Sequence, residues 1–203
     1  MLSVISGFSP DVPIVTDNQQ QITNNSKKMS VPQTPKPAKL VIGIITTELK
    51  IVENLVTELA SQFGPIDLVS PWMHFNYTTY YESEMGSPLF RRVFAFKPLV
   101  SQGDLSAFKL ATNQLEHHFS HKRRRRVNID PGYMLRERFV LASGKNFSHR
   151  VYIGAGIYAD LTLVYQKGSF QKLPWTYPDY SDDGMLKFLE QVRNKYILDA
   201  KWS

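Results

Sequence analysis

The chain has 203 residues, of which 42% are hydrophobic, enough for one globular domain with a buried core. It has no cysteine, which excludes disulfides, thiolate metal sites and a cysteine nucleophile and fits a reducing compartment; no apolar run approaches the ~20 residues of a membrane-spanning helix. The net charge is +6, and the run 122–126 (KRRRR) supplies most of it. These features predict a cytoplasmic protein with no membrane partner.

Residues 1–37 are predicted to form a disordered tail. The first residues lack the basic segment that starts a secretion signal. The stretch 17–28 is polar, and the segment 31–37 (VPQTPKP) contains three prolines, which favour an extended linker. Met29 stands just before that linker, so our hypothesis is that translation starts there. One domain is expected over residues 38–203.

The first half of this domain is predicted to alternate strands with helices. The β-branched run 40–47 indicates a buried strand, and apolar residues then recur at helical spacing until Gly64-Pro65 ends the helix. A second strand over 66–75 contains Pro71, which favours an edge or a bulge. A third strand over 89–96 is predicted to end at Pro98, because proline cannot donate a backbone hydrogen bond.

A second amphipathic helix is predicted after Asp104, which suits the N-cap position. The strand that follows, 126–129, should stop at Asp130-Pro131-Gly132. The resulting order, βαββαβ, is typical of ferredoxin-like folds. The prediction is therefore an α+β fold with a ferredoxin-like core, a C-terminal β extension and a final helix; the extension comprises strands over 138–143, 156–166 and beyond the Lys167-Gly168 turn, and the helix spans about 182–196.

Several familiar functional motifs are missing from the sequence. It has neither the phosphate-binding P-loop motif nor the glycine motif of dinucleotide sites, and Gly154-Ala155-Gly156 is interpreted as a bulge or kink between strand segments. His117 and His121 are four residues apart, but no glutamate completes an HExxH frame, and histidine is favourable at a helix C-terminus without a metal. No metal site is predicted, and no cofactor is indicated.

Four segments combine polar and aromatic side chains: 76–86, 126–130, 150–162 and 173–180. In one of them, strand alternation puts Arg126, Asn128 and Asp130 on one face and apolar residues on the other. Each segment also has a simpler interpretation: a loop over a sheet edge, a solvated connection, the solvent face of an antiparallel sheet or a packed lid. The pattern predicts a site only if the segments meet in space.

The sequence resembles an uncharacterised bacterial family of small domains of unknown function. The stretches that carry the resemblance are PKPAKLVIG, FGPIDL, YYESEMG, KLATNQLE, RRRVNIDPGY, HRVYIGAGIYADLTL and LPWTYPDY. It spans about residues 35–196 and implies where a site would lie, without implying a reaction. Members of the family typically begin near the position of Met29. They have Glu at the position of Asp160, so this chain keeps the carboxylate with a shorter reach.

The shared stretches coincide with polar groups of the four segments and add Lys109 and Asn113, which lie on one face of the second helix. The candidate ligand-binding residues are Arg126, Asn128, Arg150, Lys109, Asn113, Tyr80, Tyr81, Tyr152, Tyr158, Trp175 and Asp179. The candidate general acids or bases are Asp130, Asp160 and Glu84, because a carboxylate beside arginine or in an apolar wall can have a shifted pKa.

The favoured hypothesis is a pocket for a small anionic ligand that bears a phosphate or a carboxylate. Arg126, Arg150 and Lys109 would supply positive charge, and the aromatic residues would supply stacking surface. One alternative is an RNA-binding module, favoured by the ferredoxin-like pattern, the KRRRR run and the strand tyrosines. Another is a structural or interaction domain without a ligand. The sequence assigns no reaction, ligand identity or oligomeric state.

Overall fold

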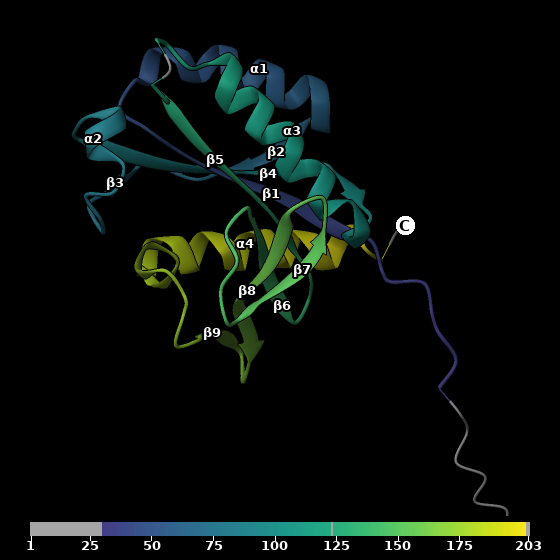
Figure 1. Cartoon of the computed structure of the whole chain (residues 1–203). Coiled ribbons are helices and arrows are strands. Elements are labelled where there is room, and N and C mark those ends of the chain that lie inside the picture. Colours follow the sequence, from purple (N-terminus) through teal and green to yellow (C-terminus); the bar gives the residue numbers. More distant parts are fainter. Residues whose placement is uncertain (1–29, 123, 202–203) are drawn as a thin grey trace, which may run out of the picture. The chain divides into compact units, whose positions relative to one another are not determined.

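The computed structural model describes residues 30–122 and 124–201 of the chain, and the compact unit begins at Thr34. In this part of the chain, nine strands form one antiparallel sheet that is covered by helices (Figure 1). The predicted α+β class is confirmed, and the nine-stranded sheet is larger than the four-stranded sheet of the predicted βαββαβ core. Most of the predicted tail, including Met29, lies outside the described residues. No helix in the described ranges is long and apolar enough to cross a membrane.

The sheet runs in the order β2-β4-β1-β5-β6-β8-β7, with β3 paired to β4 and β9 paired to β8. The strands are β1 (Ala38–Thr46), β2 (Ile66–Val69), β3 (Met73–Phe75), β4 (Leu89–Val100), β5 (Val127–Met134), β6 (Arg138–Ser143), β7 (Arg150–Gly154), β8 (Ile157–Gln166) and β9 (Ser169–Lys172). The α-helices are α1 (Val52–Phe63), α2 (Glu82–Met85), α3 (Leu105–His118) and α4 (Asp183–Asp199).

Both faces of β1 are buried, because helices cover the sheet on each side of this central strand. Alternate residues of β1 point to opposite sides. Leu40, Ile42 and Ile44 pack with α1 and α3, whereas Val41 belongs to the cluster that contains Leu189 and other apolar residues of α4. Figure 1 shows α1 and α3 on one side of β1 and α4 on the other. This two-sided burial explains why β1 is an almost continuous apolar run.

Two prolines that were predicted to end strands lie inside them. β4 continues through Pro98 to Val100, where the pairing with β1 shifts register, so Pro98 lies at an irregularity that tolerates a missing donor. β5 continues through Pro131 to Met134. Pairing between β5 and β6 starts only at Gly132, so the ladder at Pro131 is formed with β1 alone, an edge-like setting.

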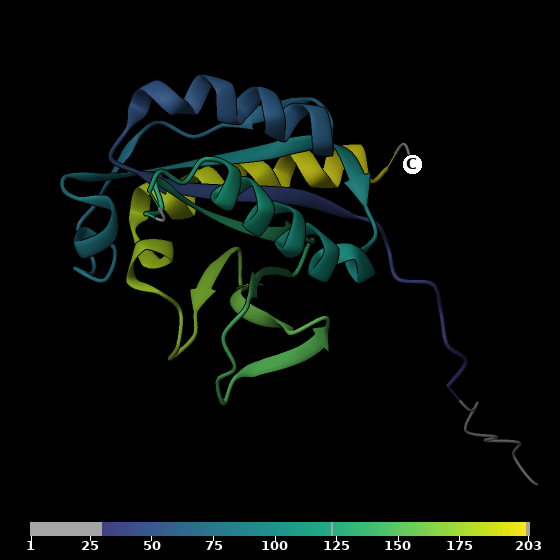
Figure 2. The same cartoon turned by 45° about the horizontal axis from the view of Figure 1, so that its top comes forward.

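The pairing between β5 and β6 is short, and the two strands separate where the candidate site lies. These strands pair at three positions, Gly132 with Leu141, Tyr133 with Val140, and Met134 with Phe139. At Gly132 a Cβ atom would lie 2.5 Å from the Val140 carbonyl oxygen, so glycine is required for this close approach. Beyond this hairpin β5 and β6 no longer pair with each other, and the strands from β7 to β9 lie away from β1 and β4 (Figure 2).

Candidate ligand-binding site

A cavity of about 650 Å³ opens where β5 and β6 separate. Residues of α3, β4 and β5 form one part of its wall, and the ends of β6, β7 and β8 form another. Three connecting segments, 75–81, 144–145 and 177–180, complete the wall together with Arg125, which precedes β5. The residues that line the cavity are Phe75, Tyr77, Thr78, Tyr80, Tyr81, Arg91, Lys109, Asn113, Glu116, Arg125, Asn128, Asp130, Leu141, Ala142, Ser143, Gly144, Lys145, Arg150, Asp160, Tyr177, Pro178, Asp179 and Tyr180.

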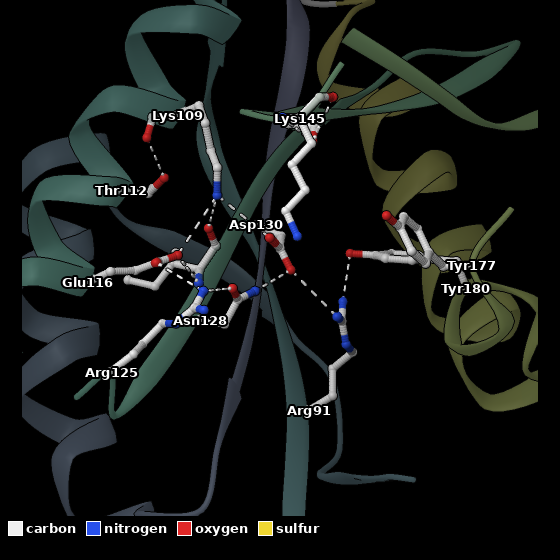
Figure 3. Close-up of polar contacts among 12 residues, drawn as sticks. Arg91, Lys109, Thr112, Glu116, Arg125, Asn128, Asp130, Lys145, Tyr177 and Tyr180 are labelled. Carbon is white, nitrogen blue, oxygen red and sulfur yellow. Dashed lines mark hydrogen bonds and ion pairs between the residues drawn. The ribbon is translucent and has the colours of Figure 1, made fainter. Parts of the chain in front are cut away.

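Asp130, on β5, is approached by donors from three elements (Figure 3). Asn128 donates from Nδ2 to Asp130 Oδ2 over 2.7 Å. Lys109 Nζ, from α3, lies 3.6 Å from Oδ1, and Arg91 Nη2, from β4, lies 3.6 Å from Oδ2. Both cations are thus ion-paired with Asp130 at distances too long for a hydrogen bond. The Asp130 side chain keeps 24% of its surface exposed, so a small molecule in the cavity can reach it.

Helix α3 satisfies the edge of β5 that β6 leaves unpaired. Lys109 Nζ donates to the Ile129 carbonyl oxygen over 2.7 Å, and the Ile129 N–H donates to Glu116 Oε1 over 2.7 Å. These backbone groups would otherwise be unsatisfied, which is costly at a buried strand edge. Burial raises the pKa of Glu116 above its ordinary value, against the opposing effect of Lys109. Lys109 therefore has a structural hydrogen bond as well as a place in the cavity wall.

Arg91 is buried behind Asp130, with only 4% of its surface exposed. Its Nη1 donates to the Tyr180 hydroxyl over 2.8 Å, and its Nε lies 3.0 Å from Asp179 Oδ2. Burial disfavours the charged guanidinium, but Tyr180, Asp179 and Asp130 outweigh it and hold the pKa of Arg91 above its ordinary value. Burial also raises the pKa values of Asp179 and Tyr180, opposed by Arg91. The inner wall therefore contains a permanent positive charge.

Arg125 holds a second part of the wall. It donates from Nη1 to Asn128 Oδ1 and from Nη2 to Glu84 Oε2, each over 2.8 Å. Its guanidinium carbon lies 5.5 Å from the centre of the Tyr81 ring. The hydrogen bond from Arg125 lowers the pKa of Glu84, so Glu84 is held in its ionised form. Glu84 thus positions Arg125 and Asn128 from behind the cavity wall.

Arg150 uses all three of its side-chain nitrogens within the protein. Nε donates to Asp160 Oδ2 over 2.9 Å, and Nη2 donates to the Tyr177 hydroxyl over 2.8 Å. Nη1 donates to Ser143 Oγ and to the Lys145 carbonyl oxygen, each over 2.9 Å. These bonds join β7, β8, the end of β6 and the segment before α4. Arg150 therefore stabilises the outer wall.

Lys145 and Tyr80 lie together on the exposed rim of the cavity. Lys145 Nζ is 3.2 Å from the Tyr80 hydroxyl and 4.4 Å from the centre of its ring. This hydrogen bond lowers the pKa of Tyr80. Among the residues that the structure describes, no carboxylate forms an ion pair with Lys145. Lys145 differs in this from the other cations of the cavity wall.

The charges that line the cavity are nearly balanced. The cations are Arg91, Lys109, Arg125, Lys145 and Arg150, and the carboxylates are Glu116, Asp130, Asp160 and Asp179. Within the described ranges, no group of three histidine, aspartate or glutamate side chains is arranged to hold a metal ion. The arrangement is suited to a ligand with both charge and hydrogen-bonding groups.

The structure brings most of the sequence-predicted site residues to this one cavity. Those in its lining are Asp130, Asp160, Asn128, Arg150, Lys109, Asn113, Tyr80, Tyr81 and Asp179. The others lie outside the lining. Glu84 binds Arg125, and Arg126 donates to Glu48 over 2.8 Å. Tyr152 and Tyr158 pack on each other across β7 and β8, and Trp175 stacks on His149.

Other lining residues were not among the predicted ones: Arg91, Glu116, Arg125, Lys145 and Tyr177. Arg91 had a usable signal, because a charged residue on the inward-facing side of an apolar strand such as 89–96 needs a buried partner. Arg125 lies just before β5 begins, so strand alternation pointed to its neighbour Arg126 instead. Lys145 lies in a turn that has no motif around it.

Comparisons with known proteins give one match. The chain matches the family described as Domain of unknown function (DUF4416) over residues 36–196, which include every strand and all but the end of α4. No curated protein and no solved structure matches the chain. Since the match covers most of the sequence, the chain belongs to the DUF4416 family.

Proposed function

We propose that the protein binds a small anionic ligand, bearing a phosphate or a carboxylate, in the cavity between β5 and β6. The observation that carries this proposal is the unpaired charge of Lys145 at the rim. Arg91, Lys109, Arg125 and Arg150 each have a carboxylate partner within 4 Å, whereas Lys145 has none among the described residues. An anionic group beside Lys145 would supply the missing partner.

The aromatic residues support a ligand with a substantial carbon framework. Tyr77, Tyr80, Tyr81 and Tyr177 contribute rings to the wall, and tyrosine offers both an apolar face and a hydroxyl. The volume of about 650 Å³ is within the range of small-molecule sites. Backbone edges at this wall are already satisfied by α3, so the wall is preformed.

Asp130 is the residue that we propose for proton transfer if the bound ligand reacts. Of the three predicted acids or bases, Asp160 is buried and hydrogen-bonded to Arg150, and Glu84 is held by Arg125. Asp130 alone among these three combines partial exposure with a place in the lining. A general acid or base must reach the reacting group, which favours Asp130 on geometry.

A thermal-shift screen with phosphorylated sugars, nucleotides and organic acids tests the proposal. We expect at least one anion to raise the melting temperature of the wild type, and Lys145→Ala to weaken its binding about tenfold. Lys172→Ala, which removes an exposed lysine on β9, is the matched control and should bind like the wild type. No stabilisation by any anion, or equal stabilisation of the Lys145→Ala variant, would contradict the proposal and favour a purely structural role.

We also propose that β1, α1, β2, β4, α3 and β5 form a ferredoxin-like core. The neighbour order β2-β4-β1-β5 and the position of both helices on one face support this assignment.

RNA binding is the second candidate function, favoured by the exposed rings of Phe147, Tyr152 and Tyr177, on which unpaired bases can stack. It predicts retention on single-stranded RNA that falls steeply with salt and is reduced by Tyr152→Ala.

A further inference from the structure

We infer that the ligand carries a hydroxyl group that binds at Asp130, so its chemical class is a hydroxylated anion. This inference rests on the proposed function and adds the chemistry of the inner wall. The anionic group would lie at the rim beside Lys145, and the hydroxyl would lie between Asp130, Lys109 and Arg91. The structural basis is the mixed charge of that inner group, in which each member keeps unused hydrogen-bonding capacity.

Around Asp130, both hydrogen-bond donors and a hydrogen-bond acceptor remain unused. Lys109 has three N–H donors and uses one, for the Ile129 carbonyl. Arg91 Nη2 makes no hydrogen bond to any described residue, and it lies 3.6 Å from Asp130 Oδ2. Asp130 accepts a hydrogen bond at Oδ2 from Asn128, and no described residue donates to Oδ1. Free donors and a free acceptor therefore border the same space.

The charges around this space select a neutral group. A phosphate placed there would be repelled by the Asp130 carboxylate, and an amine would be repelled by Lys109 and Arg91. A hydroxyl avoids both costs, because it donates its proton to the carboxylate and accepts from a cation. By contrast, Arg150 uses four of its five N–H donors within the protein, and its Nε hydrogen-bonds directly to the Asp160 carboxylate.

The rim and the inner wall then recognise different parts of one molecule. Lys145 at the rim has no carboxylate within 4 Å among the described residues, so it favours the charged group. The inner position favours the hydroxyl. A sugar phosphate or a hydroxy acid has this combination, whereas a simple alkyl phosphate or an unsubstituted carboxylic acid lacks the second part.

The test compares two matched pairs of probes by calorimetric titration: glycerol phosphate with propyl phosphate, and lactate with propionate. We expect the hydroxylated member of at least one pair to bind about tenfold or more tightly than its partner, because the partner leaves the Asp130 group unpaired. The variant Asp130→Asn keeps the shape and removes the negative charge. It should lose this preference and should bind inorganic phosphate more tightly than the wild type does, since Lys109 and Arg91 each lose one carboxylate partner and the repulsion by Asp130 is removed.

The outcomes separate this inference from the proposed function. Equal binding within both pairs, with binding still dependent on Lys145, would contradict the inference that a ligand hydroxyl binds at Asp130. It would still agree with the proposed anion site at Lys145. A preference that persists unchanged in Asp130→Asn would also overturn the inference. If no probe binds, the inference falls together with the proposed function. The comparison of probe pairs uses the wild-type protein, so it decides the question even if Asp130→Asn does not fold.

Discussion

Two buried lysines in this protein have opposite surroundings. Lys39, on β1, is fully buried and donates to Asp67 and Asp199, each over 2.8 Å. Lys109, on α3, is also buried, but its carboxylate neighbours Asp130 and Glu116 lie 3.6 and 3.8 Å away. The first lysine therefore has close ionic partners on two sides, and the second has one close neutral partner and two distant ionic ones.

The difference shows which buried charge belongs to a binding site. The bonds of Lys39 join β1 to β2 and to the end of α4, and Lys195 adds further ion pairs to the same two carboxylates. Such a cluster holds elements together. Lys109 borders a cavity with donors to spare. Burial alone does not distinguish the two lysines, whereas unused hydrogen-bonding capacity at a cavity wall does.

The largest expected effect is the loss of folding stability when Lys39 is replaced. Replacing Lys39 by Met removes the buried cation that pairs with both Asp67 and Asp199, so the free energy of unfolding should fall by about 3–5 kcal/mol. Urea unfolding measures the loss, and Lys172→Met serves as the control for removing an exposed lysine. Anion binding by the folded fraction should be unchanged. A loss below about 1 kcal/mol, or weakened anion binding, would contradict the distinction between the two lysines.

The variant Lys109→Met should lose less stability than Lys39→Met and should lose ligand binding, which Lys39→Met should retain. It removes the donor to the Ile129 carbonyl, so we expect a smaller loss of stability, about 1–3 kcal/mol. It also removes a cation from the inner wall of the cavity, so binding of a hydroxylated anion should weaken at least about tenfold. Unfolding and calorimetric titration of the same sample give both numbers. Normal binding with a large loss of stability would make Lys109 a second structural lysine like Lys39.

Local sequence patterns predicted strands and helices well where the buried residues recur at the regular spacing of the element. The strand expected over 138–143 coincides with β6, and the helix expected to end at Gly64-Pro65 is α1, which ends at Phe63. The errors at Pro98 and Pro131 both concern strand pairing: Pro98 lies at the register shift between β4 and β1, and Pro131 lies where β5 has no β6 partner. Pairing partners are not visible in a local window of the sequence.

The site was harder to predict because its geometry comes from long-range pairing. Asn128 and Asp130 could be placed on one face by alternation, and both line the cavity. Arg91 joins them only because β4 and β5 flank β1, and Lys145 joins them only because β6 leaves β5 after a short hairpin. Neither relation has a local signature in the sequence.

The smallest expected effect concerns the acids beside the two lysines. Burial opposes ionisation of Asp199, but hydrogen bonds from Lys195 and Lys39 outweigh it and lower the pKa of Asp199, whereas burial raises the pKa of Glu116. Ionised Asp199 therefore stabilises the fold above about pH 3.8, and this contribution is lost as the pH falls through its lowered pKa. For Glu116 the folded state binds more protons from about pH 4.5 up to its raised pKa, so stability falls as the pH rises through that window.

The variants Glu116→Gln and Asp199→Asn should thus change the pH dependence in opposite ways. Glu116→Gln keeps an acceptor for the Ile129 N–H and should remove the fall in stability above about pH 4.5. Asp199→Asn should remove part of the loss below about pH 3.8. Urea midpoints measured between about pH 3 and pH 7 test both. Parallel changes in the two variants would mean that the two lysine environments do not differ electrostatically, because only opposite shifts of the neighbouring acids produce slopes of opposite sign.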